Sequence, residues 1–347
     1  MNLTSRDSPG SAPGASGWLT RGAALTHYLE VARAAGLDPV ALLAEAGLPA
    51  DAALHPEAMI SGEAVRQLLE LSAERSGWPD FGLRMAEGRR LSNLGPLGLL
   101  IRDQPTLRQA MTEVVRYLHT HNQALLLRLE EVGPMVIVRE ELIVGRGGSV
   151  RQATELTLGV TARVMQLLLG SDWRPRRVCF AHPAPRDASV HRRVFGAPVE
   201  FGHDFNGIVC LASELDRPNP AADPVMAQQA RRMLEAARAA DRAGLSVEAR
   251  QLMLLLLPGG ACTVEAVAAH LGVDRRTVHR QLSKEGLSFS SLLEALRREL
   301  AARMVEERQR PLEQVASLLG FASASAFSRW HRQAFGESAR QRRSSDS

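Results

Sequence analysis

Four side chains near the C-terminus have the types and spacing that recognise DNA. Arg275, Arg276, His279 and Arg280 are separated by steps that place them on one face of a predicted helix. On an exposed helix, guanidinium and imidazole groups hydrogen-bond the edges of bases in a major groove, and they also neutralise phosphates. We therefore expect these four residues to contact double-stranded DNA.

The helix that carries them belongs to a predicted helix-turn-helix unit beginning at Thr263. Asp274 is a good N-cap for the second helix of this unit. Gly272 stands where the first helix ends, at a position that favours left-handed backbone. Apolar residues at helical spacing form the inner faces of both helices. The predicted structural core consists of Val267, Leu271, Gly272, Val278 and Leu282.

A second copy of the pattern begins at Pro311, 48 residues after the first. Its predicted core consists of Val315, Leu319, Gly320 and Phe327. Its outer face carries a second set of residues that we expect to contact DNA, namely Ser325, Ser328, Arg329 and Arg332. A single copy could be any helical hairpin, but two tandem copies with basic outer faces indicate a DNA-binding domain.

One long helix is predicted between the two units. Apolar residues recur at three- and four-residue steps from Phe289 to Arg308, which corresponds to a rod of about 30 Å. That length is close to the ~34 Å of one DNA turn, so the rod could hold two recognition helices in successive major grooves. The alternative is a helical bundle whose repeats only pack against each other.

The excess positive charge lies in the same region. Ser246 to Ser347 holds 15 Lys and Arg against 11 Asp and Glu, whereas the other 245 residues hold 27 of each. A domain that neutralises DNA phosphates requires such a distribution.

These motifs resemble a known family. The stretch from about Ser246 to Arg343 resembles the DNA-binding domain of AraC/XylS-type transcriptional regulators, most specifically in LLGFASASAFSRWHRQAFGES, residues 318–338, and in DRRTVHRQL, residues 274–282. The chain differs from the family pattern at two positions. His331 replaces an aromatic residue four positions after Phe327, and Ala339 replaces a proline.

His331 is expected on the inward face of the second recognition helix, where burial would lower its pKa below the usual value of about 6.5. The alternative is an outward rotation that brings the ring to DNA.

The region 18–220 is predicted to be a separate α+β domain. One helix is expected where apolar residues recur at helical spacing from Leu25, and it ends at Gly36. A second helix is expected to begin after Asp38. Further helices are expected over residues 61–75, 106–118, 150–169 and 223–241. Strands are expected over residues 124–130, 134–140, 177–180 and 207–211.

This region resembles the domain conventionally named arabinose-binding, in the family branch that includes ornithine-utilisation regulators. The matching landmarks are AGLDP from Ala35, PDFGLRM from Pro79, LGPLG from Leu94, DWRPRRVCFAHPAP from Asp172 and FGAPVEFG from Phe195. The resemblance implies a domain that senses a small-molecule effector and self-associates as a homodimer. It does not identify the effector-binding residues.

No catalytic, cofactor or metal site is expected. Cys179, Cys210 and Cys262 are far apart and form no CxxC pair, so buried apolar roles are expected for them. The histidines 119, 121, 182, 191 and 203 lack a cysteine or carboxylate at ligand spacing, so they are expected to be solvated or hydrogen-bonded. The glycine-rich residues 145–149 lack the lysine of a P-loop and are expected to form a loop.

The sequence therefore predicts an α+β effector domain, residues 18–220, followed by a linker helix, residues 221–245, and an all-α domain with two helix-turn-helix units joined by a long helix, residues 246–347. Residues 1–17 are expected to form a disordered tail. The predicted function is a cytoplasmic, sequence-specific transcriptional regulator that responds to an effector and acts as an activator on promoter DNA and RNA polymerase. Two alternatives are a DNA-repair or modification enzyme carrying this module, and an interaction protein that does not bind DNA.

Overall fold

The computed structural model describes residues 18–142, 148–240, 245–258, 260–271, 273–306 and 310–345. Five expectations from the sequence fall outside these residues. They concern the tail over residues 1–17, most of the glycine-rich loop, the end of the linker over residues 241–244, Gly272 and the end of the long helix near Arg308.

The N-terminal half is built around a mixed sheet of five strands, in the order β3-β4-β7-β5-β6. Their bounds are β3 Leu125–Val132, β4 Met135–Leu142, β5 Arg177–Phe180, β6 Val199–Phe201 and β7 Asn206–Leu211. Neighbouring strands are antiparallel except for β5 and β6. The helix α7, Arg151–Leu169, packs against this sheet, and its buried residues join the main apolar core.

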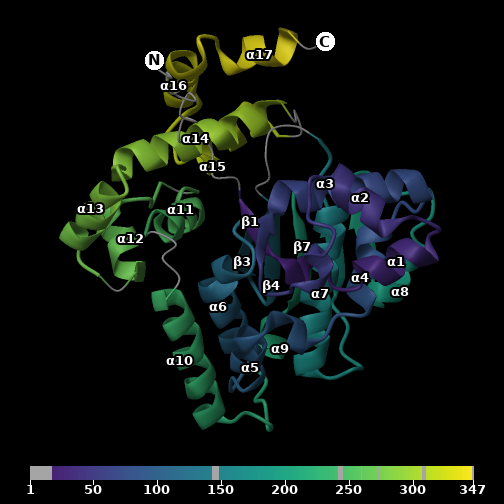
Figure 1. The fold of residues 1–347 in the computed structure, drawn as a ribbon. Coiled ribbons are helices and arrows are strands. Elements are labelled where there is room, and N and C mark those ends of the chain that lie inside the picture. Colours follow the sequence, from purple (N-terminus) through teal and green to yellow (C-terminus); the bar gives the residue numbers. More distant parts are fainter. Residues whose placement is uncertain are drawn as a thin grey trace, which may run out of the picture.

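Shorter elements surround the sheet (Figure 1). A second sheet pairs β1, Leu19–Arg21, with β2, Met59–Ser61. The α-helices are α1 Tyr28–Ala34, α2 Pro39–Glu45, α3 Gly62–Ser76, α4 Phe81–Glu87, α5 Pro96–Arg102, α6 Leu107–Tyr117, α8 Ser189–Phe195, α9 Ala212–Leu215 and α10 Pro224–Ala240. Short 3-10 helices are η1 Gly22–Leu25, η2 Ala52–Leu54, η3 Leu91–Leu94 and η4 Leu118–Thr120.

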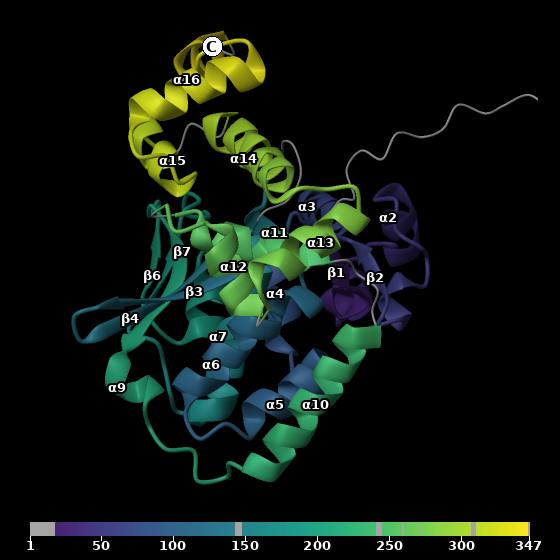
Figure 2. The same ribbon diagram turned by 90° about the vertical axis from the view of Figure 1, so that its left-hand side faces the viewer.

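The C-terminal half is helical throughout the residues that the structure describes. Its helices are α11 Leu245–Leu256, α12 Val264–Leu271, α13 Arg275–Lys284, α14 Phe289–Glu306, α15 Leu312–Leu318, α16 Ala324–Phe335 and α17 Ala339–Ser345. Figures 1 and 2 show α14 crossing between the two helix-turn-helix units. This arrangement confirms the predicted fold class.

Local sequence signals account for most of these elements. Asp38, Ser61 and Thr106 cap α2, α3 and α6 through their side chains, as N-caps should. The four predicted strands are present with shifts of one or two residues at their ends. The strands β1, β2 and β6 were not predicted, because three residues are too few for a recognisable alternation. The helices α4 and α5 coincide with landmarks of the family resemblance.

No helix among the described residues is both long enough and apolar enough to cross a membrane.

Candidate DNA-binding surface and internal cavity

The first helix-turn-helix unit, α12 and α13, is assembled as its sequence predicts. Val267, Val278 and Leu282 are completely buried, and Leu271 packs partly buried against the same cluster. The Asp274 carboxylate accepts a hydrogen bond from the Thr277 amide at 2.7 Å, so it caps α13.

The outer face of α13 is open to solvent. Arg275, Arg276, His279 and Arg280 are all exposed. Arg275 Nη1 lies 3.2 Å from the carboxylate of Glu265 on α12, so part of its charge is already paired. The Arg276 side chain makes no hydrogen bond or ion pair with the residues that the structure describes, which leaves it available to a ligand outside the chain.

The second unit, α15 and α16, repeats this construction. Val315, Leu319 and Phe327 are buried, and Ser323 caps α16 by accepting a hydrogen bond from the Ala326 amide at 3.2 Å. Gly320 ends α15 at a φ of 70°, and a Cβ there would stand 2.7 Å from the carbonyl oxygen of Leu257. Only glycine meets both conditions without strain.

The outer face of α16 presents the second predicted set. Ser325, Arg329 and Arg332 are exposed, and Ser328 is half-buried. Within the described chain, the guanidinium groups of Arg329 and Arg332 have no hydrogen bond or ion pair. The structure therefore brings each predicted set together on one exposed helix face.

Side chains of α14 fix the second unit in place. Arg297 Nε donates to the Leu319 carbonyl at 3.1 Å, and Arg298 Nη1 donates to the Ala334 carbonyl at 3.0 Å. The Glu294 carboxylate accepts from Trp330 Nε1 at 2.9 Å. The sequence analysis did not single out these residues, because they lie on the polar face of α14 and resemble an ordinary solvated surface.

His331 is completely buried, as expected from its register with Phe327. Its ring stands between those of Phe327, at 5.6 Å, and Phe335, at 4.5 Å. Nδ1 lies 2.8 Å from the Glu337 carbonyl, to which it donates, and Nε2 is buried without a partner. Burial lowers the pKa of His331, although the hydrogen bond to Glu337 opposes this shift. The ring is therefore turned inward and is not rotated outward to the exposed face of α16.

The N-terminal domain also contacts α14. Trp18 Nε1 donates to Glu299 Oε1 at 2.6 Å, and the other oxygen of Glu299 pairs with Arg250 of α11. The Arg250 guanidinium lies 4.2 Å from the centre of the Trp18 ring, within range of a cation–π interaction. Below, the term interdomain contact denotes Trp18, Arg250 and Glu299.

A second point of contact lies at the end of β4. Arg303 of α14 donates to the Leu142 carbonyl, and Arg310 Nη1 donates to Glu141 Oε1 at 3.2 Å. Burial alone would raise the pKa of Glu141, but the charges of Arg310 and Arg303 outweigh it and lower that pKa. The carboxylate is therefore ionised at neutral pH and holds both arginines.

The N-terminal domain contains a cavity of about 160 Å³ between β3, α3, α6 and α7, which is partly open to solvent. Most of its lining is apolar, including Val65, Leu69, Leu97, Met111, Val114, Leu127, Leu156, Val160 and Val164. No sequence pattern marks this cavity, since its lining comes from many separate segments and forms no motif.

Most of the five histidines considered above are hydrogen-bonded. His121 contacts Arg21 with its Nδ1 at 3.0 Å from Nη1, and burial lowers the pKa of His121 to about 3, with the charge of Arg21 adding to the shift. His182 and His191 both approach the buried carboxylate of Glu155, at 3.4 and 3.1 Å. Glu155 comes from a distant part of the chain, so sequence spacing did not indicate this acid.

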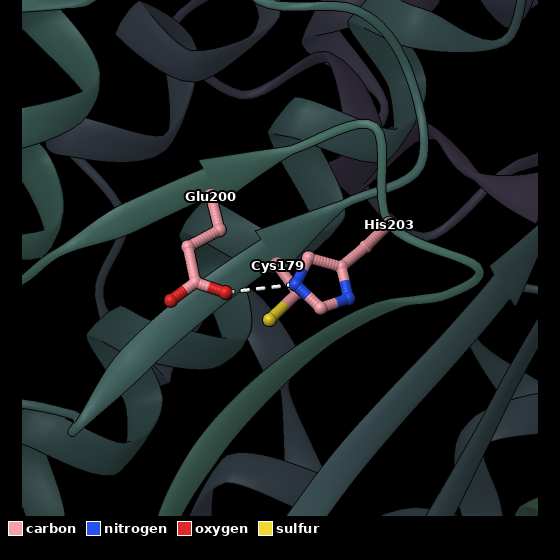
Figure 3. A group of neighbouring side chains, drawn as sticks. All are labelled: Cys179, Glu200 and His203. Atoms are coloured by element: carbon pink, nitrogen blue, oxygen red, sulfur yellow. Dashed lines mark hydrogen bonds and ion pairs between the residues drawn. The ribbon is translucent and has the colours of Figure 1, made fainter.

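The fold also places one cysteine close to a histidine. Figure 3 shows Cys179, Glu200 and His203, whose possible ligand atoms lie within 4.8 Å of one another. Sequence spacing did not indicate this group, because pairing of β5 with β6 assembles it. Glu200 and His203 hydrogen-bond each other at 2.7 Å, and burial raises the pKa of Cys179 to about 11.

Comparison with known proteins places the chain among helix-turn-helix transcriptional regulators, which bind DNA. Residues 36–219 match the family described as the N-terminal arabinose-binding domain of AraC transcription regulators, and residues 267–345 match a helix-turn-helix domain family. The chain belongs to the AraC family. It is a DNA-binding regulator and not an enzyme, and its N-terminal effector-binding domain implies a ligand.

Two curated regulators match most of this chain. The transcriptional regulator VirS of Mycobacterium tuberculosis is 33% identical over 329 residues, which cover 94% of this chain and 97% of VirS. The ornithine utilization regulator of Pseudomonas aeruginosa is 28% identical over 276 residues, covering 79% and 81%. The crystal structure of the regulator CdpR from Pseudomonas aeruginosa aligns with a TM-score of 0.45 at 20% identity, over 88% of this chain and 96% of CdpR.

The burial of His331 generates a prediction about pH. Because its pKa in the folded protein lies below the unfolded value, the unfolded chain takes up the proton first as the pH falls. The free energy of unfolding should thus decrease below about pH 6.5 until the folded pKa is also passed. His331→Phe should flatten this dependence. At neutral pH the variant loses the hydrogen bond to Glu337, which contributes about 0.5–1.5 kcal/mol to the free energy of unfolding. This loss is offset because the variant also removes Nε2, a polar atom that is buried without a partner.

Urea unfolding of both proteins at about pH 7.5 and 5.5 checks this. His55→Gln, at an exposed histidine, is the matched control and should keep the wild-type dependence. An unchanged pH dependence in His331→Phe would show that His331 does not titrate as a buried group.

Proposed function

We propose that this regulator is a ligand-responsive activator that places α13 and α16 in successive major grooves of promoter DNA. Residues 18–220 would sense the effector, residues 221–245 would connect, and residues 246–347 would bind DNA. The observation that carries this proposal is the pair of exposed helix faces, on which Arg276, Arg329 and Arg332 have no hydrogen bond or ion pair of the side chain in the described chain. Such side chains are free to bind base edges and phosphates.

The geometry of α14 supports simultaneous docking of both units. Its 18 residues correspond to about 27 Å, which approaches the ~34 Å of one DNA turn. Side chains of α14 also hold the second unit rigidly, through Arg297 and Arg298. In this proposal Arg276, His279 and Arg280 read bases in one groove, and Ser325, Ser328, Arg329 and Arg332 serve the other.

A connection between cavity and α14 supports ligand responsiveness. Three residues that line the cavity also contact the segments that hold α14. The carbonyl of Leu142 accepts from Arg303, the amide of Gly62 donates to the Trp18 carbonyl at 2.8 Å, and Ala124 shares an apolar cluster with Trp18. A ligand that displaces these residues would shift the position of α14. It would thereby change the orientation in which the two helix-turn-helix units contact DNA.

Three further parts of the proposal come from what regulation requires and from the family resemblance. An activator acts where the promoter DNA lies, which we take to be the cytoplasm, and it contacts RNA polymerase there. The N-terminal domain would self-associate into a homodimer.

The proposed base contacts lead to a test with arginine variants. Arg276→Ala and Arg329→Ala should each weaken binding to a preferred site by about 1–3 kcal/mol and relax preference at one or two base pairs. Arg33→Ala is the control, because it removes the same charge from the exposed surface of α1. The measurement is a gel shift on sites that the wild-type protein selects from random DNA. Equal weakening on all sequences, with a shallower salt dependence, would instead assign the arginines to phosphates.

The interdomain contact gives a second test. Glu299→Ala removes the acceptor shared by Trp18 and Arg250, and charge-assisted bonds of this kind contribute about 1.5–3 kcal/mol. Hydrogen exchange should therefore accelerate in both β1 and α14, and the affinity for promoter DNA should change. Glu74→Ala, at an exposed position of α3, should alter neither. If Glu299→Ala also leaves exchange and DNA affinity at wild-type values, the contact does not couple the domains.

A further inference from the structure

The charged residues that line the cavity are all of one sign. Five arginines line it, and none of its lining residues in the described chain is an acid. These arginines are Arg21, Arg66, Arg89, Arg90 and Arg163. An apolar cavity with only cationic groups favours a ligand that combines an apolar body with a negative charge.

Arg89 is the most informative of the five. Its side chain is buried, with 7% of the residue exposed, and it donates to two backbone carbonyls, those of Ala23 and Ala24. Its Nε is buried without a partner, and no carboxylate pairs with it in the described chain. Desolvation lowers the pKa of Arg89 to about 10, which still leaves it charged at neutral pH. A buried charge without a counter-ion is costly, so an anion at this position would be stabilised.

Two of the other arginines are already neutralised from outside the cavity. Arg21 pairs with Glu57, and Arg66 pairs with Glu63, and neither of these acids lines the cavity. Arg90 and Arg163 are exposed and have no ion pair in the described chain. The uncompensated charge therefore lies at Arg89, with two solvated arginines to attract an entering anion.

The size of the cavity limits the apolar body. An apolar cavity of about 150 Å³ accommodates benzene, and this one measures about 160 Å³. The apolar part that fits fully inside is thus about six to eight carbons.

We propose that this cavity is the effector site and that its ligand is a monocarboxylate with a compact apolar body, whose carboxylate pairs with Arg89. The inference rests on the proposed function, because it identifies the class of effector that the N-terminal domain senses. It excludes sugars and other neutral polyols, since a mostly apolar wall would leave their hydroxyl groups without partners.

The test uses the full-length protein and a series of straight-chain carboxylates from butanoate to dodecanoate. Calorimetry and melting temperature should show saturable binding, strongest in the middle of the series, with stabilisation by mass action. Octan-1-ol and octylamine have the same number of carbon atoms as octanoate, and they carry no charge and a positive charge, respectively. They should bind at least about tenfold more weakly than octanoate, as expected for loss of a charge-assisted hydrogen bond.

Two variants distinguish the contribution of the Arg89 charge to binding from that of the cavity volume. Arg89→Gln should weaken octanoate binding about tenfold or more and leave the weak binding of octan-1-ol unchanged, whereas Arg33→Gln should affect neither. Val160→Phe fills the cavity but keeps Arg89, and it should abolish binding of octanoate. If Arg89→Gln does not fold, the comparison of octanoate, octan-1-ol and octylamine on the wild-type protein decides alone.

The outcomes are distinguishable from failure of the proposed function. A protein that shifts promoter DNA but binds none of the carboxylates, or binds octan-1-ol as tightly as octanoate, overturns this inference and leaves DNA binding intact. Octanoate binding that survives Val160→Phe also overturns it, because the ligand then lies elsewhere. Loss of promoter binding by the unliganded and liganded protein alike would contradict the proposed function instead.

Discussion

The position of α14 is the constraint on which the rest of the molecule depends. This helix contacts both helix-turn-helix units and the N-terminal domain at once. Glu299 lies where α14 contacts both the N-terminal domain and α11, because its carboxylate accepts from Trp18 and pairs with Arg250. A shift of α14 would therefore move the DNA-facing helices and disturb the N-terminal contacts together.

The apolar core makes the same connection by other means. Trp18, Ala124 and Leu126 of the N-terminal half are buried in one cluster with the residues of α11 to α17. The linking helix α10 packs in the opposite direction along the chain, toward the N-terminal domain. Its Ala227, Ala230 and Leu234 belong to the core of that domain. The two domains thus share buried surface, and this surface lies beside a wall of the cavity through Ala124.

The sequence predicts what local chemistry determines. Capping residues, helical periodicity and the repeated Leu-Gly ending locate both helix-turn-helix units and the exposed faces of α13 and α16. The burial of His331 follows from its four-residue step after Phe327. These features depend on neighbours along the chain, so a pattern is sufficient to find them.

Features assembled from distant segments could not be read in this way. Trp18 and Glu299 are 281 residues apart, and nothing local marks either as half of a contact. Cys179, Glu200 and His203 come together only because β6 pairs with β5. Arg89 looks like any surface arginine in the sequence, and only tertiary burial shows that its charge lacks a counter-ion.

The two helix-turn-helix units are alike in construction but unequal in the groups they expose. One presents arginines with a histidine, and the other presents serines beside its arginines. A chain that contacts DNA through both imposes a polarity on its target, since the two halves of the site are chemically different. Inverting such a site relative to a gene turns the whole protein around and carries the N-terminal domain to the opposite side. The orientation of the site, and not only its sequence and distance, then determines which neighbouring protein the regulator can reach.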